Sequence, residues 1–101
     1  MDRPNLEIHP EAVEEARAAR EWYEARSPAA AESFVEELDD AMERIAGAPE
    51  SWGYYLHGAR ACLLHRFPYI VVYRQFEESI QVVAIAHGRR RPGYWKDRSQ
   101  E

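Results

Sequence analysis

The residues with the clearest capacity for chemistry lie in the C-terminal half of the chain. One histidine is accompanied along the sequence by five arginines: His87 with Arg60, Arg66, Arg89, Arg90 and Arg91. Histidine can accept and release a proton near neutral pH, because its ordinary pKa is about 6.5. Arginine stays charged and binds the oxygens of a phosphate in pairs. Together these side chains could transfer protons beside a bound anion, provided that the fold brings them close.

A β-sheet is the element that could position these side chains. Three segments are rich in Val, Ile, Leu, Tyr and Phe: residues 58–67, 69–75 and 79–87. Pro68 and a polar turn separate them, which predicts three strands in an antiparallel meander. His87 ends the third strand. Because side chains alternate along a strand, Arg60 and Arg66 are expected on one face of the sheet, unless a bulge interrupts the first strand.

The N-terminal half predicts a short strand followed by two helices. Residues 6–8 alternate apolar and acidic side chains, and a helix is expected over residues 10–26. A second helix is expected over residues 28–47, with Ser27 as its cap. Apolar residues recur at intervals of three and four in both segments, so each helix has one face to bury. The short connection predicts an antiparallel hairpin.

The resulting order is β-α-α-β-β-β, an α+β fold in which the helical hairpin packs on one face of a small antiparallel sheet. The other face is expected to be open to solvent or a partner and to gather the arginines of the C-terminal half. A chain of 101 residues fits one domain, residues 1–101, with residues 88–101 as a C-terminal tail.

Charge is distributed unevenly along the chain. Residues 1–56 carry 5 Arg and 14 Asp or Glu, a balance of −9, whereas residues 57–101 carry 8 Lys or Arg and 4 acidic residues, a balance of +4. An acidic protein is a poor general nucleic-acid binder, because affinity for phosphate grows with the number of cations presented together. The basic half can still bind an anion locally.

Composition also bears on the cellular compartment of the protein and on the metal sites that it could form. Cys62 is the single cysteine, so it forms no disulfide within the chain and no cysteine-based zinc cluster. No stretch approaches the roughly 18 apolar residues of a membrane span, and the start lacks the pattern of a signal peptide. We therefore expect a cytoplasmic protein without membrane contact, metal or other cofactor.

Four segments resemble one family of small bacterial proteins: residues 18–24, 48–52, 63–74 and 84–95. The Arg-Phe-Pro-Tyr element and the His-Gly-Arg-Arg-x-Pro-Gly-Tyr-Trp ending are specific when they occur together. On these residues the chain resembles the RelE/ParE superfamily of toxins from type II toxin–antitoxin pairs, also called plasmid stabilisation proteins, over about residues 6–98. The resemblance implies a toxin with this β-α-α-β-β-β fold that arrests growth unless a cognate antitoxin neutralises it.

The two branches of this superfamily differ in chemistry. RelE-like members are metal-independent ribonucleases that cut mRNA on the ribosome (mRNA interferases), whereas ParE-like members inhibit DNA gyrase and have no established catalytic residues. The ending from His87 to Arg90 is closer to the ParE-like branch, and Lys96 is the only lysine, unlike the lysine-rich ribosome-cutting relatives. A degenerate member that only binds antitoxin is a third possibility. The sequence therefore leaves open whether the protein is an enzyme.

The ribonuclease hypothesis assigns a role to particular residues. Metal-free RNA cleavage needs a base for the 2′-OH, an acid for the leaving oxygen and fixed cations beside the phosphorane. His87 is the candidate for proton transfer, and Arg66 and Arg90 are the candidates for holding the phosphate. Contacts with the substrate are expected from four further residues: Arg60, Arg89, Arg91 and Tyr94. Tyr94 could stack on a base.

Each of these residues also has a structural interpretation. His87 could order the C-terminal turn, and Arg60 and Arg66 could pair with acidic groups of the helices or of the antitoxin. Residues 89–91 could form a solvated loop, since exposed runs of charge usually do. The rings of the Pro-Gly-Tyr-Trp ending could pack back onto the domain. The three other histidines are expected to be structural: His9, His57 and His65.

Overall fold

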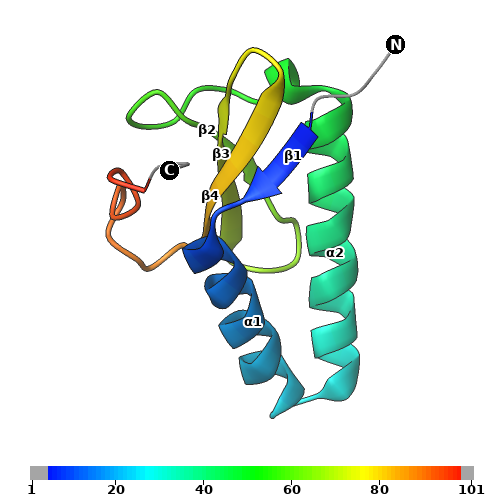
Figure 1. The fold of residues 1–101 in the computed structure, drawn as a ribbon. Coiled ribbons are helices and arrows are strands. Elements are labelled where there is room, and N and C mark those ends of the chain that lie inside the picture. The colour runs from blue at the N-terminus through cyan, green and yellow to red at the C-terminus, as the bar shows by residue number, and fades with distance from the viewer. Residues whose placement is uncertain (1–4, 99–101) are drawn as a thin grey trace.

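The structure is a computed structural model that describes residues 5–98. Its elements in chain order are β1 (Asn5–Ile8), α1 (Pro10–Glu24), α2 (Pro28–Gly47), the short 3-10 helix η1 (Pro49–Ser51), β2 (Arg60–Leu63), β3 (Tyr69–Gln75) and β4 (Ser79–His87). This order confirms the predicted β-α-α-β-β-β fold. Figure 1 shows the hairpin of α1 and α2 on one side of the strands and the C-terminal segment on the other. Within residues 5–98, no helix has the length and apolar character needed to span a membrane.

The four strands form one sheet in the order β1-β4-β3-β2. β2 pairs with β3, and β3 with β4, in antiparallel fashion, which confirms the meander. β1 instead runs parallel to β4, with Ile8 opposite Val82, so the sheet is mixed rather than wholly antiparallel. Parallel neighbours require a long connection, and the helical hairpin with β2 and β3 supplies it. The pairing with β1 stops at Val82, so the last part of β4 lies beside α1 instead.

The helical hairpin forms as the apolar spacing predicts. The Ser27 hydroxyl accepts a hydrogen bond from the N–H of Ala30 at 3.2 Å and so caps α2, while α1 ends two residues before the expected Arg26. The buried faces of both helices pack on the sheet around Phe34, which is completely buried. Cys62 lies in the same core. Burial of these apolar side chains is the main stabilising contribution of the hairpin.

The opposite face of the sheet is covered in part by the C-terminal segment, which corrects the expectation of an open face, although Leu63 at its edge stays exposed. Trp95 is 1% exposed. It packs in a second core with five buried residues: Ala59, Val72, Val83, Ala84 and Ala86. The Arg74 guanidinium fixes this segment by donating to the main-chain carbonyls of Lys96 and Arg98 at 3.2 and 3.1 Å. Residues 88–98 thus fold onto the sheet, because its apolar side chains on this face also have to be removed from water.

The strand β2 starts two residues later than predicted because a tight turn precedes it, and it also ends earlier than predicted, at Leu63. His57 and Gly58 have φ angles of 53° and 76°. The N–H of Ala59 donates to the carbonyl of Leu56 at 2.9 Å. Two consecutive residues in the left-handed region are typical of a type I′ hairpin turn. The turn carries His57 toward the C-terminal segment, where its ring meets that of Trp95 edge to face.

Candidate functional site

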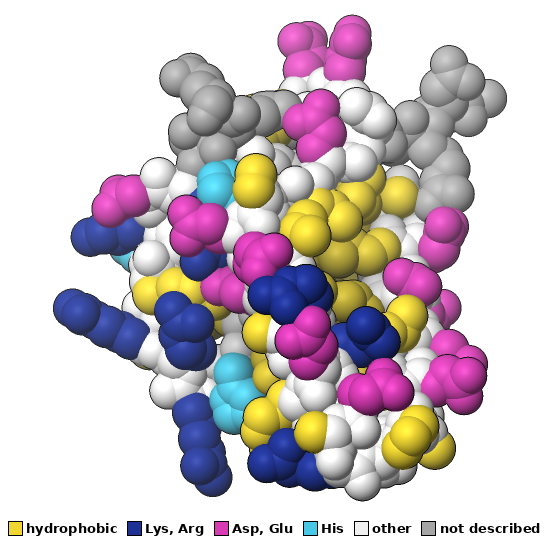
Figure 2. Space-filling view, turned by 60° about the horizontal axis from the view of Figure 1, so that its bottom comes forward, with side chains coloured by type: hydrophobic (Ala, Val, Ile, Leu, Met, Phe, Trp, Pro, Cys, Tyr) yellow, Lys and Arg dark blue, Asp and Glu magenta, His cyan; other side chains and the backbone are white. Residues whose placement is uncertain are grey.

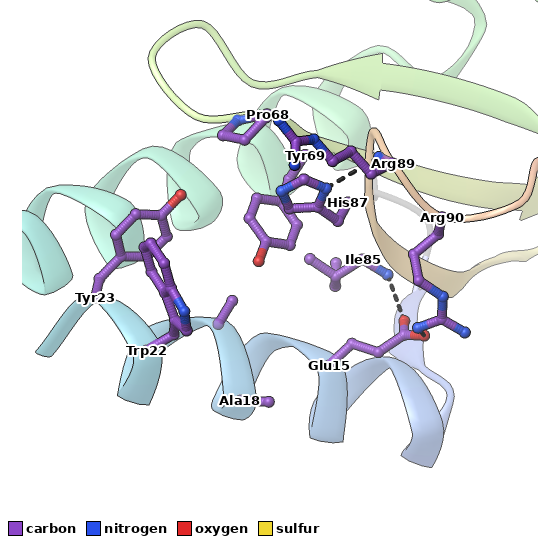
Figure 3. A pocket seen from close by; sticks show the side chains of 11 residues that line it. Glu15, Ala18, Trp22, Tyr23, Pro68, Tyr69, Ile85, His87, Arg89 and Arg90 are labelled. Atoms are coloured by element: carbon purple, nitrogen blue, oxygen red, sulfur yellow. Dashed lines mark hydrogen bonds and ion pairs between the residues drawn. The ribbon is translucent and has the colours of Figure 1, made fainter. Parts of the chain in front are cut away.

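A cleft of about 530 Å³ lies between α1 and the end of β4. Eleven residues line it: Glu15, Ala18, Ala19, Trp22, Tyr23, Pro68, Tyr69, Ile85, His87, Arg89 and Arg90. Figure 3 shows the rings of Trp22 and Tyr23 at one end, Arg90 beside Glu15 at the other, and His87 between them. The cleft therefore joins an aromatic end to a basic end. It brings together three of the residues proposed from the sequence, namely His87, Arg89 and Arg90.

His87 orders the turn that follows β4. Its Nδ1 accepts a hydrogen bond from the main-chain N–H of Arg89 at 3.0 Å. Its ring packs edge to face on Tyr69, with the ring centroids 5.0 Å apart. When the ring is neutral, an accepting Nδ1 requires the proton to sit on Nε2, so the second nitrogen is a donor. The arrangement fits a positioning or binding role directly, whereas a general base would need the Arg89 contact to open.

Arg90 has its guanidinium 3.8 Å from the ring centroid of Tyr94 and 4.0 Å from a Glu15 carboxylate oxygen. Such stacking on an aromatic ring holds the arginine in place without removing its charge. About half of the Arg90 side chain remains exposed. Arg90 is therefore fixed at the mouth of the cleft and still able to bind an anion.

Arg66 does not line the cleft of His87. It lies in the loop after β2 and pairs with Glu37 of α2, whose carboxylate is 3.5 Å from the Arg66 Nε. Burial opposes ionisation of Glu37, but the main-chain N–H groups of His65 and Arg66 and the Arg66 guanidinium outweigh it and lower the pKa of this carboxyl. For Arg66, the structure matches the alternative of pairing with an acidic group of the helices.

Arg60 also lies apart from the cleft. It stands opposite Tyr73 and two residues before Cys62, so its side chain lies on the same, helix-covered face of the sheet as theirs. Its guanidinium donates to the carbonyl of Trp52 and stacks on Tyr54, 4.1 Å from the ring centroid. β2 ends at Leu63, so strand alternation does not extend from Arg60 to Arg66. The expected gathering of arginines on the far face is therefore wrong for these two residues.

Glu15 connects the cleft to the C-terminal segment. Its Oε1 accepts the main-chain N–H of Ile85 at 2.9 Å, in the part of β4 that β1 does not reach. Its Oε2 accepts the Tyr94 hydroxyl at 2.7 Å and the Arg98 guanidinium at 2.9 Å. Burial and the hydrogen bond to Glu15 raise the pKa of Tyr94, which keeps its hydroxyl protonated as the donor. One carboxylate thus ties α1, β4 and the C-terminal segment together.

Sequence reasoning missed Glu15, although a signal for it exists. Glu15 lies three residues after Ala12 and four before Ala19, both of which are buried, so helical spacing places it on the inward face of α1. A carboxylate on a buried helix face needs a cationic or hydrogen-bonding partner. That partner is Arg98, eighty-three residues later, and its identity follows only from the fold.

The unpaired cations of the described chain lie near its C-terminus. Within residues 5–98, the arginines up to Arg74 have an ion pair, a main-chain hydrogen bond or an aromatic ring as partner, and so do Arg90 and Arg98. Three basic side chains in this range have none: Arg89, Arg91 and Lys96. Figure 2 shows several basic side chains projecting from one edge of the molecule, whereas acidic side chains are spread over the rest of the view. This part of the chain is therefore able to meet an anionic partner.

Comparisons with known proteins place this geometry in a family. The sequence profile described as "ParE toxin of type II toxin-antitoxin system, parDE" matches residues 6–92. A solved structure of the chromosomal ParDE toxin–antitoxin system of P. aeruginosa is similar to the fold, with a TM-score of 0.74 and 20% sequence identity. The similarity covers 84% of this chain and 96% of that one. A comparison with curated protein sequences gives no significant match.

Proposed function

The chain belongs to the ParE toxin family of type II toxin–antitoxin systems, and from this premise we propose that it arrests bacterial growth by binding a macromolecular target through its C-terminal basic segment. The segment is residues 89–98. The single observation that carries the proposal is that the unpaired cations of the described chain all lie in this segment. Cations that have no internal partner and are held on a rigid backbone can pair with a binding partner, because no existing ion pair has to be broken first.

The rigidity of the segment supports binding. Trp95 is buried under the sheet, and Arg98, with a side chain that is 12% exposed, is held by Glu15. A preorganised surface loses little conformational entropy when it binds, which favours affinity and specificity.

The cytoplasm, where the targets of such toxins are found, is the compartment that we propose.

DNA gyrase is the target that we propose first. The family model that matches this chain is that of the ParE branch. Resemblance to this branch implies inhibition of gyrase without catalytic residues. The geometry is consistent with a binding protein, because Arg66 lies against α2 instead of beside His87, and His87 uses one nitrogen to hold Arg89. We therefore favour inhibition by contact over chemistry.

Ribosome-dependent mRNA cleavage is the second candidate. The observation in its favour is that His87 and Arg90 line one cleft together with the aromatic rings of Trp22 and Tyr23, where a base could stack. Proton transfer by His87 and charge stabilisation by Arg90 would then be the catalytic contributions. The two candidates differ in whether His87 is essential.

A cognate antitoxin is the partner that family membership supplies, and we propose that it covers the same cleft. The cleft has an aromatic end and a basic end, so it suits a segment with apolar side chains followed by acidic ones. An antitoxin bound there would also screen the charges of Arg89 and Arg90. Binding would then explain neutralisation without any change of fold.

The test compares two triple variants that remove the same charge. R89Q/R90Q/R91Q neutralises three cations of the basic segment. R17Q/R20Q/R26Q neutralises three exposed arginines, two in α1 and one just after it, whose side chains contact α1. Each variant is induced in a bacterial host and assayed as pure protein for inhibition of gyrase supercoiling and for cleavage of ribosome-bound mRNA. We expect growth arrest and gyrase inhibition to be lost in the first variant and retained in the second.

Other results select among the alternatives. Cleavage of ribosome-bound mRNA by the wild type that disappears in H87A would establish the ribonuclease candidate instead. Equal loss in both triple variants would show that the C-terminal segment has no special role. If the induced wild type does not slow growth, the chain is a degenerate homologue that only binds antitoxin.

A further inference from the structure

A second pocket, of about 400 Å³, lies on the C-terminal segment away from the cleft of His87. Six residues line it: His57, Arg91, Pro92, Gly93, Tyr94 and Lys96. Three of these carry nitrogen donors on their side chains, and none of the six is acidic. From this composition we propose that the pocket binds a single phosphate group. The proposal does not depend on the target of the toxin.

The charges in this pocket are free to act on a ligand. Within residues 5–98, the side chains of Arg91 and Lys96 form no ion pair or hydrogen bond, and both residues are exposed. An arginine and a lysine supply complementary contacts: the planar guanidinium binds two oxygens, and the ammonium supplies a compact point charge. An oxyanion between them would thus gain charge-assisted hydrogen bonds without breaking existing ones.

The backbone is shaped to bring the third donor into the pocket. Gly93 is buried with a φ of 83°, a conformation that favours glycine. A Cβ atom at this position would lie 2.8 Å from His57 Nε2 and 3.2 Å from Cδ2, which is too close. Glycine therefore allows the imidazole of the type I′ turn to approach the C-terminal segment. The close approach of His57 to residue 93 thus depends on the absence of a side chain at Gly93.

The wall of the pocket is held in place by the surrounding fold. The N–H of Tyr94 donates to the carbonyl of Arg91 at 3.2 Å, and the N–H of Lys96 donates to the carbonyl of Gly93 at 2.9 Å. The Tyr94 hydroxyl is anchored to Glu15. These turns fix the backbone positions of Arg91 and Lys96, so folding already meets the backbone part of the entropic cost of gathering two cations.

The experiment is a titration with inorganic phosphate at constant ionic strength, followed by the amide NMR signals of Gly93 and Lys96. Sodium chloride at the same ionic strength is the reference. We expect saturable shifts with phosphate and not with chloride, and about tenfold weaker binding in R91Q and in K96Q, since each removes one charge-assisted contact. R89Q is the matched control, because the Arg89 side chain is also exposed and unpaired but lines the other cleft.

Two further ligands distinguish the sources of a phosphate group. A nucleoside 5′-monophosphate presents a terminal phosphate, and a dinucleotide without terminal phosphate presents only a backbone diester. Tighter binding of the dinucleotide would assign the pocket to a nucleic-acid backbone, and tighter binding of the monophosphate would assign it to a small phosphorylated ligand. Shifts that phosphate and chloride produce equally, or losses in R91Q and K96Q no larger than in R89Q, would overturn the proposal.

Discussion

Replacement of Glu15 is expected to destabilise the protein more than any other single change to a charged residue of α1. Glu15→Ala removes the acceptor of three hydrogen bonds: those from the Ile85 N–H, the Tyr94 hydroxyl and the Arg98 guanidinium. Their loss would detach the C-terminal segment from α1. It would also leave the Ile85 N–H without its acceptor at the part of β4 that β1 does not reach.

The magnitude follows from the burial of the groups involved. The side chains of Glu15 and Arg98 are 15% and 12% exposed, so the pair is largely shielded from water. Removing one partner of a buried pair costs about 3–5 kcal/mol. Arg98 keeps its contacts with Glu11 and with the Val83 carbonyl, which places the effect near the lower end, about 3 kcal/mol. For a domain of this size, that corresponds to a fall in Tm of roughly 12–24 °C.

The assay is thermal and urea unfolding followed by circular dichroism. Glu14→Ala is the matched control, because Glu14 is the preceding residue of the same helix and forms an exposed ion pair with Arg17. Exposed pairs of this kind contribute little to stability, so the control should unfold close to the wild type. Glu15→Gln should fall between the two, since the amide oxygen still accepts a hydrogen bond but no longer offsets the charge of Arg98. Equal unfolding of Glu15→Ala and Glu14→Ala would refute the assignment of Glu15 as the link to the C-terminal segment.

Three further outcomes are expected. Trp95→Ala should cost about 3–5 kcal/mol in urea unfolding because it empties the second core, and a wild-type-like midpoint would show that this core contributes nothing. Because the pKa of Glu37 is lowered in the folded state, its ionised carboxylate stabilises the fold at pH values above the ordinary pKa of 4.5. This contribution is lost as the pH falls below 4.5. The Tm of the wild type should therefore drop more steeply than that of Glu37→Gln in this acidic range, and parallel curves would contradict it. Burial raises the pKa of the Cys62 thiol, so a thiol reagent should modify Cys62 at the rate of unfolding, and rapid labelling of the native protein would rule this out.

The covered far face changes how the C-terminal segment can be studied. A truncation after Gly88 would remove Trp95 and Arg98 together with the basic residues, so it would expose the second core as well as remove charge. Loss of activity in such a variant would not identify the contacts. Charge-neutralising substitutions at exposed positions leave both cores intact and are therefore the sharper experiment.

The local elements were predictable because their causes lie within a few residues. Ser27 followed by Pro28 determines where α2 begins, and the spacing of apolar residues determines which face is buried. The enrichment of residues 69–75 and 79–87 in Val, Ile, Tyr and similar residues, with Pro68 and a polar turn as boundaries, predicted β3 and β4 with their observed bounds. The Arg-Phe-Pro-Tyr element and the motif that ends at Trp95 were together enough to indicate the family. These features need no information from distant parts of the chain.

The site depended on contacts that no local pattern contains. The meeting of Glu15 with Arg98, the approach of His57 to Gly93, and the separation of Arg66 from His87 each join segments that are far apart in sequence. Composition established that the C-terminal half is basic, but not which cations would be used inside the fold. Packing decided which cations have internal partners. The apolar side chains on the far face of the sheet had to be removed from water, so the C-terminal segment folds back across the strands. In this arrangement Arg89, Arg91 and Lys96 are left without internal partners.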